Sequence, residues 1–336
     1  MIDPPRPGPA PRWLAGGSYF SLDGLHRVRS FADGSLPRPA AYQAVGMRPV
    51  RVDPGDVEYE LADSAWLAGR DGTVSPAAIA YFLDAPVTNP VHTTIEARMS
   101  IRTVRLSIDF HGTASPGDGP FLSPGTLAGV RDGVGLGEAR MVTAGGDLVA
   151  TGACRTVILD PSGREGGPDS PVPTEAVEGP WSVPAPGIPP DVGEPGLDYL
   201  ERLVGGADQP PFWALLGAHV SEAEPGRAVL AMPADPWLGT HVGILYGGVT
   251  ASFGVAAAEA ALWAGDAAGE RTRMLSYTHD FTRMVHIDDP VVIGEAHLVH
   301  RGRTLAVADV ELRDSEGRRV GLGRATGLVG SVSSYE

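Results

Sequence analysis

The two halves of the chain repeat each other at a constant spacing. The segment RPAAYQAVG matches QPPFWALLG, and VDPGDVEYELADSAWL matches EAEPGRAVLAMPADPWL. The matched residues, all 171 positions apart, include Pro39 and Pro210, Gly46 and Gly217, Gly55 and Gly226, Trp66 and Trp237, Gly72 and Gly243, Phe82 and Phe253, Asp109 and Asp280, and Gly152 and Gly323. Because the offset holds without a gap over more than 100 residues, the chain is a duplication of one module.

A proline-rich segment separates the two modules. Residues 161–196 contain 10 prolines and 7 glycines, too many for a helix or a central strand, and predict an extended linker. The linker divides a first repeat, 21–160, from a second repeat, 197–336. Residues 1–20 are expected to form a flexible arm, because their prolines oppose a helix and they lack the apolar core of a signal peptide.

Each module contains one long, nearly uncharged segment. In the second module it is LYGGVTASFGVAAAEAAL, which has two glycines at its third and fourth positions and is apolar on almost every side. Such a helix is buried all round, and 18 residues that include a glutamate make a poor membrane span. The alternating segments RTVRLSIDF, VIGEAHLVHRG and TLAVADVELRD predict strands. The expected fold class is therefore α+β, with an antiparallel sheet curled around a central apolar helix in each repeat.

Charge and cysteine content exclude several classes of protein. The formal net charge of -15 argues against a protein that grips nucleic acid or an anionic membrane over a wide face. The single cysteine, Cys154, excludes an internal disulfide and a multi-cysteine metal cluster, and no spacing of histidines supports a metal site. These features favour a cytoplasmic protein.

The glycine-started helix and the strands after it resemble a known family. YGGVTASFG followed by HDFTRMVHIDDPVVIGEAHLVHRGRTLAVADVELRD looks like the hotdog-fold acyl-CoA thioesterases of the phenylacetyl-CoA type. The first module, with SPAAIAYFLDAP, LSIDFHG and GGDLVATGACRTVIL, resembles the acyl-CoA thioesterase II branch. The resemblance implies a tandem double hotdog, in which the two sheets join edge to edge and the central helices lie side by side.

In that family each active site combines one carboxylate with the start of the other module's helix. The resemblance places Asp84 at the position of the catalytic carboxylate, and Tyr246, Gly247 and Gly248 at the positions of a His-Gly-Gly opening. Unpaired N–H groups at a helix start suit a thioester carbonyl that becomes an oxyanion. Tyr246 is expected either to donate its hydroxyl to the acyl carbonyl or to pack.

The same comparison of the two modules indicates that the second site lacks both the carboxylate and the glycine pair. Val255 stands where the second module would carry its acid, and Ser75, Pro76 and Ala77 stand where the first module would carry its glycines. Pro76 has no N–H to donate. The losses are complementary, so the sequence predicts one complete composite site per chain.

Asp84 also has a structural interpretation. It is the only charged residue from Pro76 to Val91, and burying an isolated carboxylate is costly unless function or a partner retains it. A helix that ended at Pro86 would instead leave Asp84 bonding a loop.

Further candidates follow from the same resemblance. Ser107 stands where the thioesterase II branch has a hydroxyl that helps orient water, and Cys154 stands where that branch has a glutamine, so this triad is incomplete. A buried cysteine is more often core filling than a nucleophile. Arg283, Arg301 and Arg303 are candidates for binding the phosphates of coenzyme A, with solvated surface as the alternative.

The sequence thus predicts hydrolysis of an acyl thioester, with coenzyme A as part of the substrate and no separate cofactor. An acyl carrier protein conjugate is an alternative substrate, and a homo-oligomer is compatible with the sequence. Asp84 would either activate water or attack the carbonyl directly. The alternative functions are a hotdog dehydratase or lyase and a non-catalytic binder of acyl ligands.

Overall fold

The computed structural model describes residues 14–160, 184–188, 193–205 and 208–331. Its first half follows the order helices, hairpin, long helix and four strands. The elements are α1 (Gly17–Ser21), α2 (Gly24–Asp33), α3 (Ala40–Ala44), β1 (Met47–Asp53), β2 (Asp56–Leu61), the 3₁₀ helix η1 (Ala65–Leu67), α4 (Pro76–His92), β3 (Ser100–Phe110), β4 (Phe121–Arg131), β5 (Val134–Val142) and β6 (Leu148–Leu159).

The second half repeats this order. Its elements are α5 (Gly196–Leu203), α6 (Pro211–Leu216), β7 (His219–Glu224), β8 (Arg227–Met232), the 3₁₀ helix η3 (Pro236–Leu238), α7 (Gly247–Trp263), β9 (Glu270–Phe281), β10 (Val292–Arg301), β11 (Leu305–Arg313) and β12 (Arg319–Ser331). Each module therefore has a two-stranded hairpin before its central helix.

All twelve strands form one antiparallel sheet. Its order is β1-β2-β4-β5-β6-β3-β9-β12-β11-β10-β8-β7, so the modules join through β3 and β9. In this junction Ser107 lies opposite Thr278, the residue 171 positions later, and the pseudo-two-fold axis passes through that pair. Arg105 and Asp280 form a bidentate salt bridge across the junction, with distances of 2.6 and 2.8 Å.

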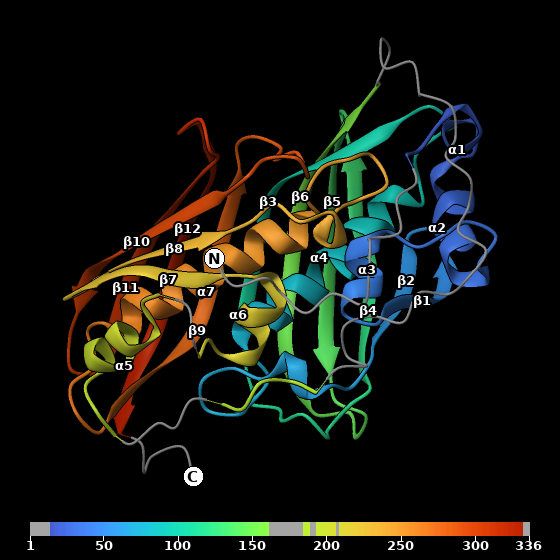
Figure 1. Ribbon diagram of the computed structural model, residues 1–336. Helices are drawn as coiled ribbons and strands as arrows, with labels where there is room; N and C mark the ends of the chain where they lie inside the picture. Colours follow the sequence, from blue (N-terminus) through green and yellow to red (C-terminus); the bar gives the residue numbers. More distant parts are fainter. Residues whose placement is uncertain (1–13, 161–183, 189–192, 206–207, 332–336) are drawn as a thin grey trace.

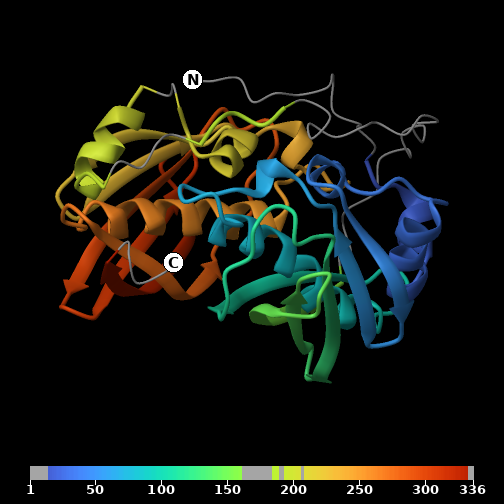
Figure 2. The ribbon, with the colours of Figure 1, turned by 90° about the horizontal axis from the view of Figure 1, so that it is seen from below.

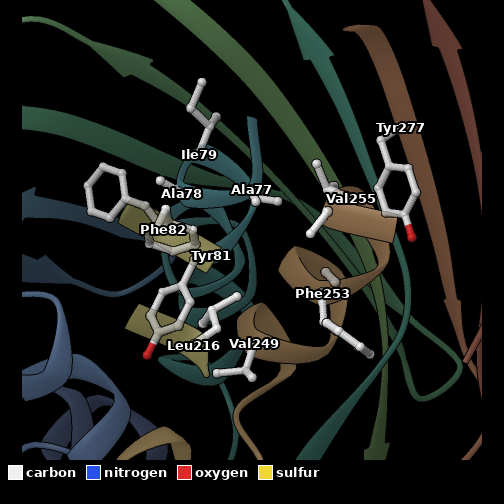
Figure 3. Packing of buried hydrophobic residues seen from close by; sticks show 14 of the residues in the cluster. Ala77, Ala78, Ile79, Tyr81, Phe82, Leu216, Val249, Phe253, Val255 and Tyr277 are labelled. Atoms are coloured by element: carbon white, nitrogen blue, oxygen red, sulfur yellow. The ribbon is translucent and has the colours of Figure 1, made fainter. Parts of the chain in front are cut away.

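The two central helices lie together on one side of the curved sheet (Figures 1 and 2). Residues 77–91 of α4 and 248–263 of α7 are all buried, which explains why neither helix has a polar face. Ala77, Val255 and their apolar neighbours from both modules belong to one hydrophobic core (Figure 3). The predicted α+β double hotdog is confirmed. None of the helices in the described ranges is long and apolar enough to cross a membrane.

Helix α4 continues through two internal prolines. Pro86 and Pro90 each remove a helical hydrogen bond, yet the helix runs on to His92. Close packing on all sides maintains it, and the Pro86 carbonyl oxygen approaches strand β4 so closely that a Cβ added to Gly125 would lie only 1.9 Å away. The alternative in which the helix ends at Pro86 is therefore wrong, and Asp84 lies in mid-helix.

The structural repeat extends further toward the N-terminus than the sequence match. The Gly24 N–H donates to the Ile95 carbonyl oxygen, and the Gly196 N–H donates to that of Asp266, so α2 and α5 dock in the same way. Glycine is required at both starts, because an added Cβ would lie 1.7 Å from His92 O and 1.8 Å from Trp263 O. These glycines are 172 residues apart, so the first repeat has one residue more than the second between this glycine and the start of the sequence match.

The predicted arm and linker lie largely outside the described residues. The expectation of a flexible arm up to residue 20 is wrong at its end, because Gly17–Ser21 form α1. Tyr19 is buried there and packs against Phe31 and the guanidinium of Arg27. Of the linker, residues 161–183 and 189–192 lie outside the described ranges, and α5 begins at its last residue.

Candidate active site

Asp84 points from the middle of α4 to the start of α7. Its side chain is buried, with a relative exposure of 4%. A Cβ atom added to Gly247 would lie 3.0 Å from Asp84 Oδ2 and 3.2 Å from Oδ1, so the carboxylate rests directly against this glycine. The structure thus brings together a carboxylate of the first repeat and the helix start of the second repeat.

The N–H groups at the start of α7 are not capped by the N-cap side chain of their own helix. Its N-cap residue, Tyr246, makes no side-chain cap hydrogen bond. Gly248 cannot be exchanged for a larger residue, because an added Cβ would lie 2.4 Å from Tyr81 O and 2.4 Å from an atom of the Tyr246 ring. The helix therefore presents uncapped N–H donors and its partial positive charge to Asp84.

Burial dominates the electrostatics of Asp84. Desolvation raises its pKa from the ordinary 3.8 to about 7, and the Tyr246 hydroxyl and the Gly248 N–H oppose part of that rise. Asp84 Oδ1 and the Tyr246 hydroxyl have no hydrogen-bond partner of good geometry in the described part of the chain. The Tyr246 hydroxyl thus lies near Asp84 without a hydrogen bond of good geometry. A carboxyl group with a pKa near neutrality suits general-base chemistry.

Tyrosine rings surround the start of α7. The Tyr246 ring meets the edges of Tyr42 and Tyr81, each with 5.4 Å between ring centroids. Tyr59 packs edge-on against Tyr42 at 6.0 Å. Burial raises the pKa of both Tyr42 and Tyr246, and the nearby Asp84 charge adds to the rise in each. These hydroxyls stay protonated at neutral pH and can act as donors.

The pseudo-symmetric interface lacks this arrangement. At the start of α4 the Ala77 N–H donates to the Ser75 hydroxyl at 3.1 Å, so the helix is capped by its own side chain. Ser252 of α7 donates to Ala77 O at 2.8 Å, and Val255 is fully buried and apolar. The second interface thus has neither the carboxylate at the family position nor the free N–H donors.

Other charged groups fill the surroundings of the second interface. The Arg70 guanidinium lies 4.0 Å from the ring centroid of Tyr199 and 5.2 Å from that of Trp263. Glu259 is one helical turn beyond Val255, and burial raises its pKa well above the ordinary value, assisted by the Asp71 charge. A buried acid thus lies one turn from Val255, and Arg70 packs on aromatic rings that include the last residue of α7.

Two family descriptions match the two repeats separately. The Acyl-CoA thioesterase C-terminal domain matches residues 24–154, and the Thioesterase superfamily matches residues 242–320. Together they cover more than half of the chain. The chain belongs to the hotdog-fold thioesterase superfamily. The first match begins at Gly24, where the structural repeat also begins.

Solved structures agree with this superfamily at the level of fold. A Thermobifida fusca protein proposed to be a thioesterase II has a TM-score of 0.55 and 17% identity, and the similarity covers 88% of this chain and 99% of that one. A hot dog fold protein of unknown function from Alicyclobacillus acidocaldarius has a TM-score of 0.53, 13% identity and coverages of 87% and 98%. A tesB protein of Mycobacterium avium subsp. paratuberculosis has a TM-score of 0.52, 10% identity and coverages of 90% and 99%. A search of curated proteins gives no match.

Ser107 does not belong to the site, although the thioesterase resemblance placed it there. Along β3 the side chains of Leu106 and Ile108 are buried in the core, and Ser107 lies on the opposite face. There it lines an open groove of about 530 Å³ together with Glu138 and Arg140. The expectation that Ser107 orients water beside Asp84 is therefore wrong.

Cys154 lies on the inner face of the sheet and is not a water-positioning group. Its thiol donates to the Val87 carbonyl oxygen at 3.0 Å. Burial, together with the nearby Asp84 charge, raises its pKa to about 12. The thiol is thus protonated and engaged with the helix backbone, which agrees with core filling.

The three candidate arginines are not gathered at one place. Arg301 pairs with Asp266 and Glu270 at 3.0 and 2.6 Å, beside Gly265 after the end of α7. Because 17 helical residues span about 25 Å, Arg301 lies far from Gly247, and the nearby exposed Arg303 shares that end. Neither arginine lies at the helix start that Asp84 contacts, and their role in binding the phosphates of coenzyme A stays a prediction.

Arg283 lies at the opposite end of α7. It is exposed, two residues before Val285, whose carbonyl oxygen accepts from Leu245 N–H just ahead of the helix start. Of the three arginines, Arg283 alone is held close to the glycine pair. It stays a candidate for the phosphates of coenzyme A.

Proposed function

We propose that the protein hydrolyses acyl thioesters at one composite site between its two repeats. The observation that carries this proposal is the contact of the Asp84 carboxylate with the uncapped helix start at Gly247. Carboxylate and donors come from different repeats, and each group has lost its counterpart at the other interface. We infer an acyl-CoA or acyl carrier protein conjugate as the substrate and water as the second reactant.

In this mechanism Asp84 is a general base. It takes a proton from water, the water oxygen attacks the thioester carbonyl carbon, and the N–H groups of Gly247 and Gly248 stabilise the oxyanion. Collapse of the tetrahedral intermediate breaks the C–S bond, and the proton held by Asp84 passes to the leaving thiolate. The products are a carboxylic acid and a free thiol.

Asp84 contacts the glycines when no substrate is bound, so substrate binding there is expected to change the pKa of Asp84. The Gly248 N–H lowers the pKa of Asp84. A thioester oxygen that takes over this donor removes a hydrogen bond from the ionised carboxylate and so strengthens the base. Because Asp84 is only 4% exposed, substrate binding must also displace the side chains that cover it.

Thiol release from a panel of acyl-CoA thioesters and acyl carrier protein conjugates tests the proposal. We expect turnover by the unaltered chain and at least about a hundredfold loss in Asp84→Asn. Release of thiol separates hydrolysis from a lyase and from a non-catalytic binder. Normal turnover by folded Asp84→Asn would remove Asp84 from the mechanism.

Labelled water distinguishes base catalysis from direct attack. In a single turnover in H₂¹⁸O, base catalysis puts the label into the carboxylic acid product and leaves Asp84 unlabelled. Attack by Asp84 would form an anhydride with the acyl group, and its hydrolysis at the aspartyl carbon would put the label into Asp84. Mass spectrometry of the peptide that contains Asp84 reads the outcome.

The number of sites per chain is a separate test. A symmetric hotdog dimer has two equivalent sites, whereas the asymmetry of this chain predicts one. Titration with a non-hydrolysable thioester analogue should therefore saturate at one equivalent per chain. Saturation at two equal sites would contradict the composite site.

A further inference from the structure

The sheet of the first repeat carries an open groove of about 530 Å³ across strands β3, β4, β5 and β6. The groove lies on the face turned away from α4. On the inner face, the Cys154 thiol donates to the Val87 carbonyl oxygen of α4, and a Cβ added to Gly137 would lie 2.0 Å from that oxygen. The residues next to them in the strands, Ala153 and Glu138, therefore point outward. They lie opposite each other, and the small Ala153 leaves space beside the Glu138 side chain.

The second repeat fills the same place with an arginine. The residues 171 positions after Glu138 and Ala153 are Asp309 and Arg324, which also lie opposite each other. The Arg324 guanidinium makes a bidentate salt bridge to the Asp309 carboxylate, with distances of 2.6 and 2.8 Å. The Glu138 carboxylate of the first repeat therefore lacks the arginine that its counterpart has.

A second carboxylate of the groove, Asp109, lacks its arginine in the same way. The counterpart of Asp109 is Asp280, which lies opposite Arg105 and forms the bidentate salt bridge across the junction of the repeats. The residue opposite Asp109 is Ser276, which stands 171 positions after Arg105. Two outward carboxylates that have an arginine partner in the second repeat thus face a serine and an alanine in the first.

The same groove is also lined by an arginine. Arg140 follows Glu138 by two residues on β5, so both side chains point outward, about 7 Å apart along the strand. The counterpart of Arg140 is Glu311, which pairs with Arg319 at 3.0 Å. Within the described part of the chain, no ion pair is recorded for Asp109, Glu138 or Arg140. The groove thus carries charges of both signs that are not paired within one chain.

We propose that this groove is an interface between two copies of the chain, related by a two-fold axis normal to the sheet. An axis that passes between Glu138 and Arg140 places Arg140 of the second copy over Glu138, and the reverse. The second copy then supplies the guanidinium that Arg324 supplies within the second repeat. A purely basic partner fits less well, because Arg140 stands beside the carboxylates and repels it. This interface is independent of the proposed function, since the groove and Asp84 lie on opposite sides of the sheet.

The test is the mass of the chain in solution, measured by sedimentation equilibrium in about 0.15 M salt, where the Debye length is about 8 Å. We expect the unaltered chain to form a reversible dimer. Arg140→Glu puts like charges at both symmetric contacts and should raise the Kd of the dimer at least about tenfold, and Glu138→Arg should do the same. The double variant carries both signs again and should dimerise like the unaltered chain. An equal mixture of the two single variants should form a heterodimer.

Two further variants use the comparison between the repeats. Ala153→Arg puts an arginine where the second repeat has Arg324, so its guanidinium should pair with Glu138 of the same chain, fill the groove and abolish the dimer. The exposed position of Ala153 allows this change without disturbing the core. Arg324→Glu is the matched control, because it breaks an ion pair of the same kind outside the groove and should leave the Kd unchanged. Circular dichroism shows whether each variant is folded.

A monomer at every concentration tested would overturn the proposal, and a monomer that binds an oligoarginine peptide would overturn it in favour of a basic partner. A dimer whose Kd does not change in folded Arg140→Glu, or rises equally in Arg324→Glu, would also overturn it. Failure of the double variant to dimerise would exclude the pairing of Glu138 with Arg140. Because association is measured without substrate, a chain that dimerises as expected but hydrolyses no thioester would refute the proposed function and leave this interface standing.

Discussion

Replacing Asp84 by asparagine is expected to stabilise the folded protein in alkaline solution while abolishing turnover. The carboxyl group is buried in mid-helix, and burial raises its pKa from 3.8 to about 7. In the folded protein Asp84 is therefore protonated in mild acid, whereas in the unfolded chain it is ionised. Its contribution to stability is present at low pH and is lost as the pH rises through about 7.

The expected size follows from the two pKa values. With 1.36 kcal/mol per pKa unit, the folded protein loses about 2 kcal/mol relative to Asp84→Asn between about pH 5.5 and pH 8.5. Asparagine places an amide near the N–H donors of α7, which costs stability at both pH values. The difference between the two pH values removes that constant part and isolates the ionisation of Asp84.

Denaturant unfolding of both chains at the two pH values measures this difference. Asp280→Asn is a matched control, since its partner Arg105 lowers the pKa of Asp280, which stays ionised across this range. Its effect on the free energy of unfolding should therefore be the same at both pH values. If Asp84→Asn also changed stability equally at both, the carboxylate would have no raised pKa and the reasoning would be refuted.

Four further outcomes are expected. The kcat/KM for thioester hydrolysis should rise with pH through about 7 as Asp84 ionises, and a profile that falls there would contradict a base. Among variants that circular dichroism shows to be folded, Gly248→Pro should lower kcat/KM at least about a hundredfold, whereas Ala77→Pro, which also adds a ring at a buried helix start but removes no proposed oxyanion donor, should lower stability without a comparable loss of kcat/KM. Ser107→Ala should change kcat/KM less than about twofold, because its side chain faces away from the core, and a larger loss would return it to the site. Residues 1–165 and 197–336, expressed separately, should associate or aggregate because strands β3 and β9 lose their partners, and two monomers in light scattering would show that the repeats fold independently.

Much of the fold could be predicted from the sequence because the repeated positions hold residue types that few others can replace. Glycines and prolines 171 positions apart mark the same turns in both halves, and the two uncharged helices require a sheet around them. The asymmetry of the site could also be predicted from the sequence. A single charged residue in one apolar helix and a glycine pair at the start of the other stand out against their missing counterparts.

The sequence alone did not show where tertiary packing overrides the local conformational preference of a residue. Pro86 and Pro90 are helix breakers by local preference, yet α4 continues through both because the core encloses it. Arg301 looked available for a phosphate, but folding brings it to Asp266 and Glu270 at the far end of α7. Ion pairs between distant segments depend on the tertiary structure and leave no local pattern.

The contact of Asp84 with Gly247 depends partly on the sequence and partly on the tertiary structure. The sequence determined that one carboxylate and one glycine pair are retained. A charged residue in an apolar helix is costly to bury and a glycine has no side chain, so both can be recognised in the sequence at any position. Only the tertiary structure placed α4 against α7 and turned Ser107 to the outer face of β3. The direction of a side chain and the donor it meets depend on the register of strands and the crossing of helices, which involve residues far apart in the chain.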